Sequence, residues 1–397
     1  MDLPSSIRTA AFQKLSDIPV SPEDVANLTW GAFFKLPILY HDIRGQLHVR
    51  DHVFAGMGIE PEGARFRCFM EAIERTAALS EWAMMTLPKL GQPDIPWSAF
   101  FPYTDEQICW LNHMQQGRPD YQIAATQISD GKIINVPAVA VLPWWKSFSN
   151  NCLPIPEGDG VGFAAGFSYD RASTIHRAIC EVLERDALML SWKVPRWPKR
   201  TLDKNFVADN LIKVIKQADL SLRLIDIGEA KGLRVAIAVL TDSRKQTTIG
   251  VACGDSIEND VNKAILEALM LRGSAQQLIN YRPNLTKQII TSEDHVMWGW
   301  FNGETVWEWY CPDEAQTFVR ENTDPLVACT QLGLGQPLII DVTPPDFAVL
   351  DFVVYRALIP HAFKKEYSHA YQYRGGLRLE RLGVKASELN SLPHPIG

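Results

Sequence analysis

The chain has 397 residues, of which 46% are hydrophobic and 21% are charged. These proportions are typical of a globular protein, and the length predicts either one large domain or two to three ordinary ones. The formal net charge of -7 provides no global positive field, so we expect neither nucleic acid nor an anionic membrane as a partner. Local binding of anions remains compatible with this charge.

The sequence shows no sign of export or of a membrane span. Its first residues, MDLPSSIRTAAFQKL, lack the basic segment and apolar run of a signal peptide. No apolar stretch approaches the roughly 18 residues that span a bilayer. The seven cysteines are odd in number and form no Cys-x-x-Cys pair, and the nine histidines are dispersed. These features argue against a disulfide framework and a zinc site, and predict a cytoplasmic protein.

The first half of the chain alternates apolar runs with helical patterns. KLPILYHDIRGQLHV predicts strand, turn and strand, and a long helix is expected from Gly63 to Trp82. The unbroken apolar run from Ile133 to Trp145 predicts a buried strand. EGDGVGFAAGFS predicts a glycine-rich turn that leads into a helix containing Glu181.

The second half reads as strands around one further long helix. Strands are expected at 222–228, 233–241, 247–253, 337–343 and 347–360, with a helix at 258–279. No low-complexity linker divides the chain, which favours one intertwined α/β unit over 1–397. Within it, 1–55 form a β-rich N-terminal part and 385–397 a proline-containing tail.

Two of the expected helices repeat one another. MEAIERTAALSEW and CEVLERDALMLSW begin at Met70 and Cys180. The matching pairs are Glu71 and Glu181, Glu74 and Glu184, Arg75 and Arg185, Ala77 and Ala187, and Trp82 and Trp192. AILEALMLR is a looser third copy with Glu267 and Arg272, and a glycine-containing segment precedes all three. The pattern suggests three related units that each contribute one helix to a shared centre.

The repeated glutamates predict a cation site. Residues three or four apart share a helix face, so two such helices would concentrate four carboxylates, which repel one another at low dielectric. Mg²⁺ relieves such repulsion, and it is commonly bound by one or two carboxylates together with substrate phosphates. Arginine side chains also bind phosphate oxygens. The alternative is a solvated face with intrahelical ion pairs. The sequence contains neither a P-loop nor a Rossmann glycine motif.

The glycine-rich segment and the helix after it, GFAAGFSYDRASTIHRAICEVLERDALMLSW, resemble a Gly-x-Ala-x-Gly, Glu-x-x-Glu-Arg-Asp-Ala pattern of the YcaO family. GMGIEPEGARFRCFMEAIER, GVACGDSIENDVNKAILEALMLR and VVYRALIPHA are similar to its other motifs, so the resemblance runs from about residue 55 to the end. It implies an α/β fold of mixed sheets with packed helices, built from related helix-bearing units around a central nucleotide site.

The resemblance implies ATP and Mg²⁺ as cofactors. The residues that would bind them are Glu71, Glu74, Glu181, Glu184 and Glu267, with Glu71, Glu181, Glu184 and Glu267 as metal ligands. Arg75 and Arg272 would contact phosphate. Arg185 is a weaker phosphate candidate, since pairing with Asp186 is its alternative.

The C-terminus ELNSLPHPIG resembles the Pro-rich end of azoline-forming members. In that subgroup the tail enters the active site and brings the terminal carboxylate to the chemistry, which would involve Pro393, His394, Pro395 and Gly397. Gly397 stands where a third proline is expected. Alternating prolines favour an extended, stiff arm, and the alternative is a frayed end.

The implied reaction is ATP-dependent cyclodehydration of Cys, Ser or Thr in a ribosomally made precursor peptide, through phosphorylation of the backbone amide oxygen. We expect the N-terminal region to be too short for a fused leader-binding partner. The resemblance therefore implies a separate partner that resembles ubiquitin-activating enzymes, and allows an FMN-dependent azoline dehydrogenase in the complex.

Three departures from the family pattern leave alternatives open. Met57, Arg67 and Met270 stand where the family usually has Lys, Ser and Gln. They favour a non-catalytic scaffold subunit as one alternative. Another YcaO chemistry, thioamide or macroamidine formation, is the other, and the Pro-His-Pro tail argues against it.

Overall fold

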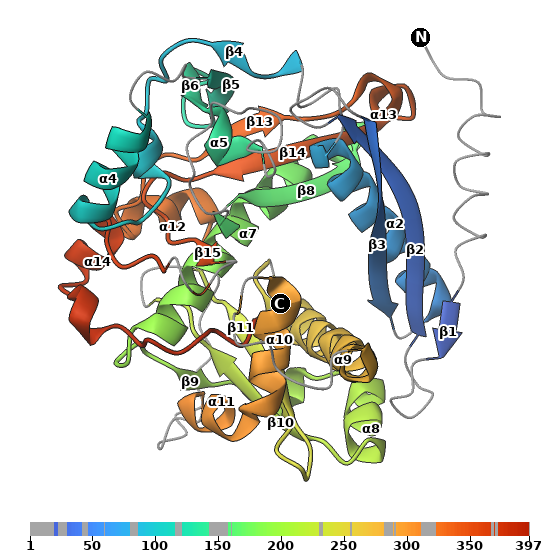
Figure 1. Ribbon diagram of the computed structural model, residues 1–397. Coiled ribbons are helices and arrows are strands. Elements are labelled where there is room, and N and C mark those ends of the chain that lie inside the picture. Colours follow the sequence, from blue (N-terminus) through green and yellow to red (C-terminus); the bar gives the residue numbers. More distant parts are fainter. Residues whose placement is uncertain are drawn as a thin grey trace.

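The structure is a computed structural model in which α-helices cover antiparallel sheets (Figure 1). Every strand pairing among the described residues is antiparallel. The described residues are 20–22, 30–41, 47–58, 60–79, 86–115, 121–142, 158–159, 161–229, 233–254, 256–281, 289, 291–310, 323–366, 369 and 372–396. Trp82 and Gly397 lie outside them.

The first sheet is a long hairpin with a short edge strand. Its order is β1 (Val20–Pro22), β2 (Trp30–His41) and β3 (Leu47–Gly58). The two expected strands are therefore confirmed, and the expected turn between them lies outside the described residues. Helix α2 (Pro61–Leu79) follows directly and packs along β3 (Figure 1).

The second sheet gathers strands from distant parts of the sequence. Its order is β4 (Lys89–Leu90), β5 (Tyr121–Gln127), β13 (Leu338–Asp341), β14 (Phe352–Leu358) and β8 (Gly162–Phe167), and β6 (Ile133–Pro137) pairs with β5. Helix α7 (Arg171–Lys193) packs on β8 and β14. In Figure 1, α7 passes through the middle of the molecule below this sheet.

The third sheet lies on the other side of α7 (Figure 1). Its order is β12 (Thr247–Ala252), β11 (Ala236–Thr241), β10 (Ser221–Asp226) and β9 (Arg200–Thr201). Helix α9 (Ile257–Tyr281) packs on β12 and β11, and α8 (Asp209–Gln217) lies against β10. Both carry apolar side chains into the core of this sheet.

Shorter elements surround these layers. The helices are α4 (Asp105–Gln115), α5 (Ala138–Val141), α10 (Ser292–Phe301), α11 (Gly303–Trp309), α12 (Pro325–Gln331), α13 (Pro345–Val349) and α14 (Leu377–Arg381). Strands β7 (Gly158–Asp159) and β15 (Lys365–Glu366) pair with each other. No helix in the described part of the chain has the length and apolar character needed to cross a membrane.

Two expected strands are wrong over part of their length. The run that begins at Ile133 is a strand only to Pro137, after which α5 begins. The run at 347–360 starts inside α13, and its strand begins at Phe352. Proline begins or precedes each of these helices. An unbroken apolar run does not by itself distinguish a strand from a buried helical turn.

The glycine-rich segment expected to be a turn is largely strand β8. Glycines bring β8, and in the same way β12, close to the helix that follows each strand. A Cβ atom on Gly162 would lie 1.6 Å from the carbonyl oxygen of Ala178, and one on Gly250 would lie 2.0 Å from that of Ala264. Glycine in a strand often marks such a close backbone approach, so here it serves helix–strand packing.

Candidate active site

The three repeated units are built in the same way. In each, an edge strand is followed by a helix whose first motif glutamate accepts a hydrogen bond from a backbone N–H of that strand. The donor and acceptor residues are Ala55 and Glu71 (3.0 Å), Phe163 and Glu181, and Val251 and Glu267 (2.7 Å). Because one Oε2 atom of each carboxylate is held by the strand, the three glutamates are fixed at equivalent positions.

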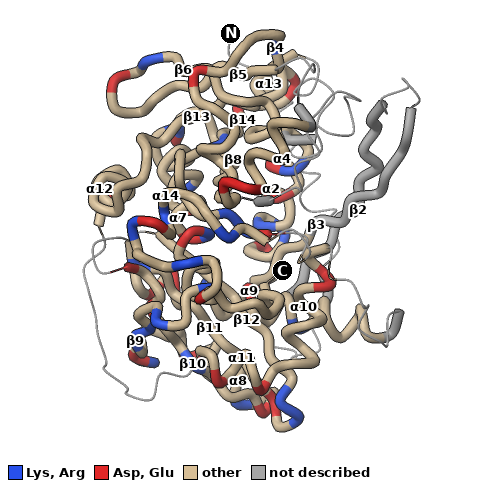
Figure 2. Tube along the Cα trace, turned by 60° about the vertical axis from the view of Figure 1, so that its left-hand side comes forward, with Lys and Arg blue, Asp and Glu red and all other residues tan. Residues whose placement is uncertain are grey.

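The units also close into a ring. Helix α2 packs on its own strand β3 and reaches β8 of the second unit. Helix α7 packs on β8 and reaches β12 of the third unit, and α9 packs on β12 and reaches β3 of the first. This cyclic arrangement brings one face of every motif helix towards the same centre. In Figure 2, acidic and basic segments lie together in the middle of the molecule, near the labels α2 and α7.

The shared hydrogen bond aligns the third helix with the other two. Met270 occupies the position of Glu74 and Glu184, three residues after the anchored glutamate. Four residues before the anchored glutamate, the three units carry Arg67, Arg177 and Lys263. Sequence reasoning missed Lys263, although the same offset of a basic residue in three units could have indicated it.

Burial and mutual repulsion set the electrostatics of the carboxylates. Burial, followed by the charge of Glu181, raises the pKa of Glu74 from 4.5 to about 8. Burial also raises the pKa of Glu184 to about 8; Glu267 and Glu181 add to the increase and Lys263 opposes it. Glutamates from all three helices therefore sense one another, which is not the behaviour of separate solvated faces.

The carboxylates of Glu71 and Glu267 and the amine of Lys263 belong to the same cluster. Burial raises the pKa of Glu71 and of Glu267, although the strand N–H bonds oppose the rise. Burial alone would lower the pKa of Lys263, but Glu184, Glu267 and Glu181 raise it overall. Lys263 is therefore held as an ammonium and offsets part of the negative charge.

The first two motif arginines both face their own glutamates. Arg75 has a 45% exposed side chain, and its Nε lies 3.9 Å from Oε1 of Glu71. Arg185 donates from Nη2 to Oε1 of Glu181 and from Nη1 to the Val161 carbonyl, both at 2.5 Å. Asp186, considered above as a partner of Arg185, is instead bound by Arg378.

Arg272 lies elsewhere. It follows Glu267 by five residues, whereas Arg75 and Arg185 follow theirs by four, and one residue turns a helix by about 100°. Its Nη2 donates to Asp242 at 2.5 Å, its Nη1 donates to the Gln246 carbonyl, and its guanidinium lies over Trp300. The structure therefore does not bring Arg272 together with the carboxylate cluster as a phosphate-binding residue.

The C-terminal tail runs into the molecule. Pro393, His394, Pro395 and Ile396 are all buried. Pro395 of the tail lies against Gly299 of α10, an element near the centre of Figure 1. For these four residues the frayed alternative is wrong, while Gly397 is outside the described residues.

The donor set suits a hard cation. Carboxylate oxygens are the ligands Mg²⁺ prefers, and Mg²⁺ usually takes only one or two of them and completes its shell with water and phosphate. Among the residues the structure describes, no group of three or more His, Cys, Asp or Glu side chains is placed to hold a metal by itself. Two motif carboxylates with phosphate oxygens fit these observations, whereas an all-protein cage does not.

A family model for YcaO cyclodehydratases, which bind ATP and Mg²⁺, matches residues 55–362. The chain belongs to the YcaO family. The matched domain is thus an ATP- and Mg²⁺-binding cyclodehydratase domain, which confirms the resemblance read from the glycine and Glu-x-x-Glu-Arg segments. No curated protein matches the sequence.

Solved structures share the fold at low sequence identity. A heterocyclase in complex with substrate and cofactor is 14% identical, with a TM-score of 0.68 over 98% of this chain and 57% of the heterocyclase chain. YcaO from Methanopyrus kandleri, bound with AMPPCP and Mg²⁺, is 18% identical, with a TM-score of 0.59 over 94% of both chains. The E. coli microcin synthetase McbBCD complex is 12% identical, with a TM-score of 0.57 over 86% of both.

Two of the three departures from the family pattern contact each other. Nη1 of Arg67 donates to the carbonyl oxygen of Met57 at 2.9 Å. The guanidinium thereby joins the start of α2 to the end of β3. The third departure, Met270, lies at the position where Glu74 and Glu184 stand in their helices.

Proposed function

We propose that the protein catalyses ATP-dependent cyclodehydration of Cys, Ser or Thr residues in a ribosomally made precursor peptide, giving thiazolines or oxazolines. The observation that carries the proposal is the ring of three helices, each with a glutamate anchored to its strand by the same hydrogen bond. Family membership indicates ATP and Mg²⁺ as what such a carboxylate cluster binds.

In the proposed reaction, a side-chain sulfur or oxygen attacks the preceding backbone carbonyl carbon and loses its proton. The resulting oxyanion attacks the γ-phosphorus of ATP, and ADP leaves. The amide nitrogen then forms the C=N bond as it loses its proton and the C–O bond to phosphate breaks. The products are the azoline, ADP and phosphate. The protein's work is positioning and charge neutralisation, as in phosphoryl transfer generally.

The carboxylates would hold the cation and the arginines would order the phosphates. Glu71, Glu181, Glu184 and Glu267 are the candidates from which one or two ligands of the cation would come, with Glu74 beside them. Bound Mg²⁺ would neutralise charge on the phosphates. Half-exposed Arg75 is the proposed phosphate contact, since Arg272 is engaged by Asp242. Arg185 holds Glu181 and would orient it.

The tail would complete the site. We place Pro393, His394 and Pro395 as a fixed arm that brings the terminal carboxylate of Gly397 to the reacting peptide. Burial of 393–396 supports this role, because an arm already packed loses little entropy on ordering. The packed tail also favours azoline formation over thioamide or macroamidine formation.

The proposed partners are the precursor peptide and a separate leader-binding protein that resembles ubiquitin-activating enzymes. An FMN-dependent azoline dehydrogenase would act on the product. The fold similarity to a heterocyclase solved with substrate and to a microcin synthetase complex supports a peptide substrate and an assembly. We place the reaction in the cytoplasm, where ATP and new peptides are available.

The test combines the protein, ATP, Mg²⁺, a candidate precursor and its partner. We expect phosphate release together with a peptide mass loss of about 18 Da, one water, per heterocycle. Glu181→Gln and Glu184→Gln should abolish both signals and leave the thermal transition in place. Full turnover in both variants would remove the metal-site assignment. Exchange of oxygen for sulfur would indicate thioamide formation, and no phosphate release with any partner would favour a scaffold.

A further inference from the structure

The tail is seated on α10 by a pair of histidines. The rings of His295 and His394 stack with centroids 3.6 Å apart and planes 3° from parallel. Nδ1 of His295 lies 2.8 Å from the carbonyl oxygen of His394. Nε2 of His394 lies 2.7 Å from the carbonyl oxygen of Glu366. Both rings are buried, with His394 only 2% exposed.

These contacts define the protonation state of His394. A carbonyl oxygen can only accept, so Nε2 of His394 must carry the hydrogen that reaches Glu366. Its Nδ1 atom is buried and has no hydrogen-bond partner in the described part of the chain. A second proton on Nδ1 would therefore find no acceptor, and the seat accepts the neutral ring.

The groups around the seat reinforce this selection. His295 faces the ring from α10, Lys365 from β15 and Lys193 from the end of α7. The nearby carboxylate of Glu366 is engaged by Lys193, with 2.7 Å between Oε1 and Nζ. Burial, followed by His295, Lys365 and Lys193, holds the pKa of His394 well below its usual 6.5, and the hydrogen bond to the Glu366 carbonyl opposes this only in part.

Gly299 is shaped to the tail. A Cβ atom at this position of α10 would lie 2.6 Å from Cβ and 3.1 Å from Cα of Pro395. Glycine inside a helix costs about 1 kcal/mol relative to alanine. Its presence here is explained by the approach of Pro395, which an alanine would block.

The seat is joined directly to the motif helix α7. Nε1 of Trp192 donates to the Leu392 carbonyl at 3.2 Å, and the Asn390 amide N–H donates to the Lys193 carbonyl at 2.8 Å. Trp192 itself is fixed among Trp298, Trp309 and Tyr310. The helix that carries Glu181 and Glu184 therefore also sets the position of the tail.

We propose that His295, Gly299 and the Glu366 carbonyl form a receptor for the chain's own C-terminal segment, and that they position it for the reaction only while His394 is neutral. His295 and Gly299 are positioning residues that act through the tail. The inference rests on the proposed function only for the reaction that the tail serves. Docking itself can be measured without turnover.

The first experiment measures docking in trans. A chain ending at Ser391 is mixed with a peptide of residues 388–397 carrying an N-terminal fluorophore, and binding is followed by anisotropy. Gly299→Ala and His295→Ala should each weaken binding at least tenfold, as expected for lost packing and a lost buried hydrogen bond. Glu293→Gln, an exposed change on the same helix, should leave binding unchanged.

The pH profile separates positioning from mere packing. Because docking excludes the protonated ring, affinity should be constant above the ordinary pKa of 6.5 and fall about tenfold per pH unit below it. A peptide with His394→Gln should bind more weakly and show no such fall. Equal pH profiles for the two peptides, or unchanged binding to Gly299→Ala, would overturn the proposal.

If the truncated chain does not fold, hydrogen exchange on the full-length chain tests the same proposal. Gly299→Ala should speed exchange in 390–396, with the rest of α10 protected as before; unchanged tail protection would overturn the proposal. Activity then separates the two hypotheses. If the tail docks as predicted but neither the unaltered chain nor any variant turns over, the proposed function is wrong and the receptor proposal stands. Turnover with docking that ignores Gly299, His295 and pH would remove the receptor alone.

Discussion

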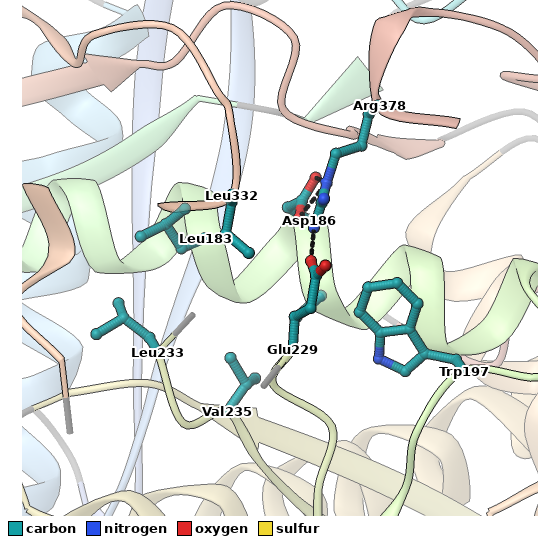
Figure 3. Close-up of a pocket in the computed structure, with 9 residues that line it drawn as sticks. Leu183, Asp186, Trp197, Glu229, Leu233, Val235, Leu332 and Arg378 are labelled. Atoms are coloured by element: carbon teal, nitrogen blue, oxygen red, sulfur yellow. Dashed lines mark hydrogen bonds and ion pairs between the residues drawn. The ribbon is translucent and has the colours of Figure 1, made fainter. Parts of the chain in front are cut away.

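Asp186 is held by Arg378, which is distant in sequence, and not by its neighbour Arg185. Nη2 of Arg378 lies 3.0 Å from Oδ2 of Asp186 and 2.6 Å from Oε2 of Glu229. Figure 3 shows the guanidinium between the two carboxylates, beside Trp197. The Phe363 N–H donates to the same Asp186 side chain at 2.7 Å. Two adjacent residues of one motif thus serve different ends, one the carboxylate cluster and the other the join between α7 and α14.

Arg378→Ala should be strongly destabilising. It would leave Asp186 buried with its charge uncompensated, and loss of one partner of a buried pair costs about 3–5 kcal/mol. Urea unfolding followed by circular dichroism measures the change. Arg381→Ala, at an exposed position of the same helix, should change stability by less than about 0.5 kcal/mol. Equal effects of the two variants would contradict the importance of this pair.

Cation binding should release protons. Burial and neighbouring charges raise the pKa of Glu74 and of Glu184 from 4.5 to about 8, so near neutral pH the folded chain holds protons that the unfolded chain has lost. Without a cation, stability should therefore fall as pH rises from 4.5 towards 8. Bound Mg²⁺ reverses this preference and should displace up to about one proton per glutamate.

Calorimetry in two buffers of different ionisation enthalpy counts the released protons on addition of Mg²⁺ and ATP. The Glu184→Gln variant should release fewer protons, and its free energy of unfolding should depend less on pH. Its amide keeps the shape of the side chain and cannot titrate. If Glu184→Gln and the unaltered chain release equal numbers of protons, the carboxylate cluster is not where the cation binds.

The glycines of the motif strands should be intolerant of alanine. In Gly162→Ala the added Cβ would lie 1.6 Å from the Ala178 carbonyl oxygen, which belongs to helix backbone and cannot rotate away. Overpacking of this kind costs about 1–3 kcal/mol or more. At Gly63, inside α2, the nearest atom is the flexible end of Arg67 at 3.4 Å, so alanine should be neutral or stabilising. Thermal melts of the two variants compare them directly.

The sequence predicts what is local and periodic. The hairpin at the start and the three motif helices follow from patterns longer than ten residues, and two exact copies of Glu-x-x-Glu-Arg indicate a shared centre. It does not predict which turn of the third helix aligns with the others. That register depends on the Val251 to Glu267 hydrogen bond, which no spacing rule contains.

Contacts between distant elements explain what the sequence could not show. The sequence suggests Arg272 as a phosphate ligand, but it cannot show that Asp242, between β11 and β12, binds the Arg272 guanidinium. His295 has no local signal, because its importance comes from a ring 99 residues further along the chain. The glycine-rich segment resembles a turn in sequence, since both turns and close helix–strand contacts require a residue without Cβ. Three-dimensional packing chose between these readings.

The two arginines named as phosphate contacts should respond oppositely to truncation. Arg75 is 45% exposed and only 3.9 Å from one carboxylate, so Arg75→Ala should leave stability within about 0.5 kcal/mol. Loss of a charge-assisted phosphate bond should instead raise the KM for ATP about tenfold. Arg272→Ala removes bonds to Asp242 and Gln246 and the contact with Trp300. It should cost about 2–3 kcal/mol of stability and leave the KM for ATP of the folded protein unchanged.

Steady-state kinetics with ATP varied, together with urea unfolding of the same preparations, test this pair of variants. Arg75→Lys and Arg272→Lys are the matched controls, since each keeps the charge and loses the planar fork. Lysine should recover most of the KM at residue 75, because a half-exposed phosphate contact needs mainly charge. It should recover little stability at residue 272, where the fork spans Asp242 and the Gln246 carbonyl. A raised KM for ATP in folded Arg272→Ala would return Arg272 to the phosphate site.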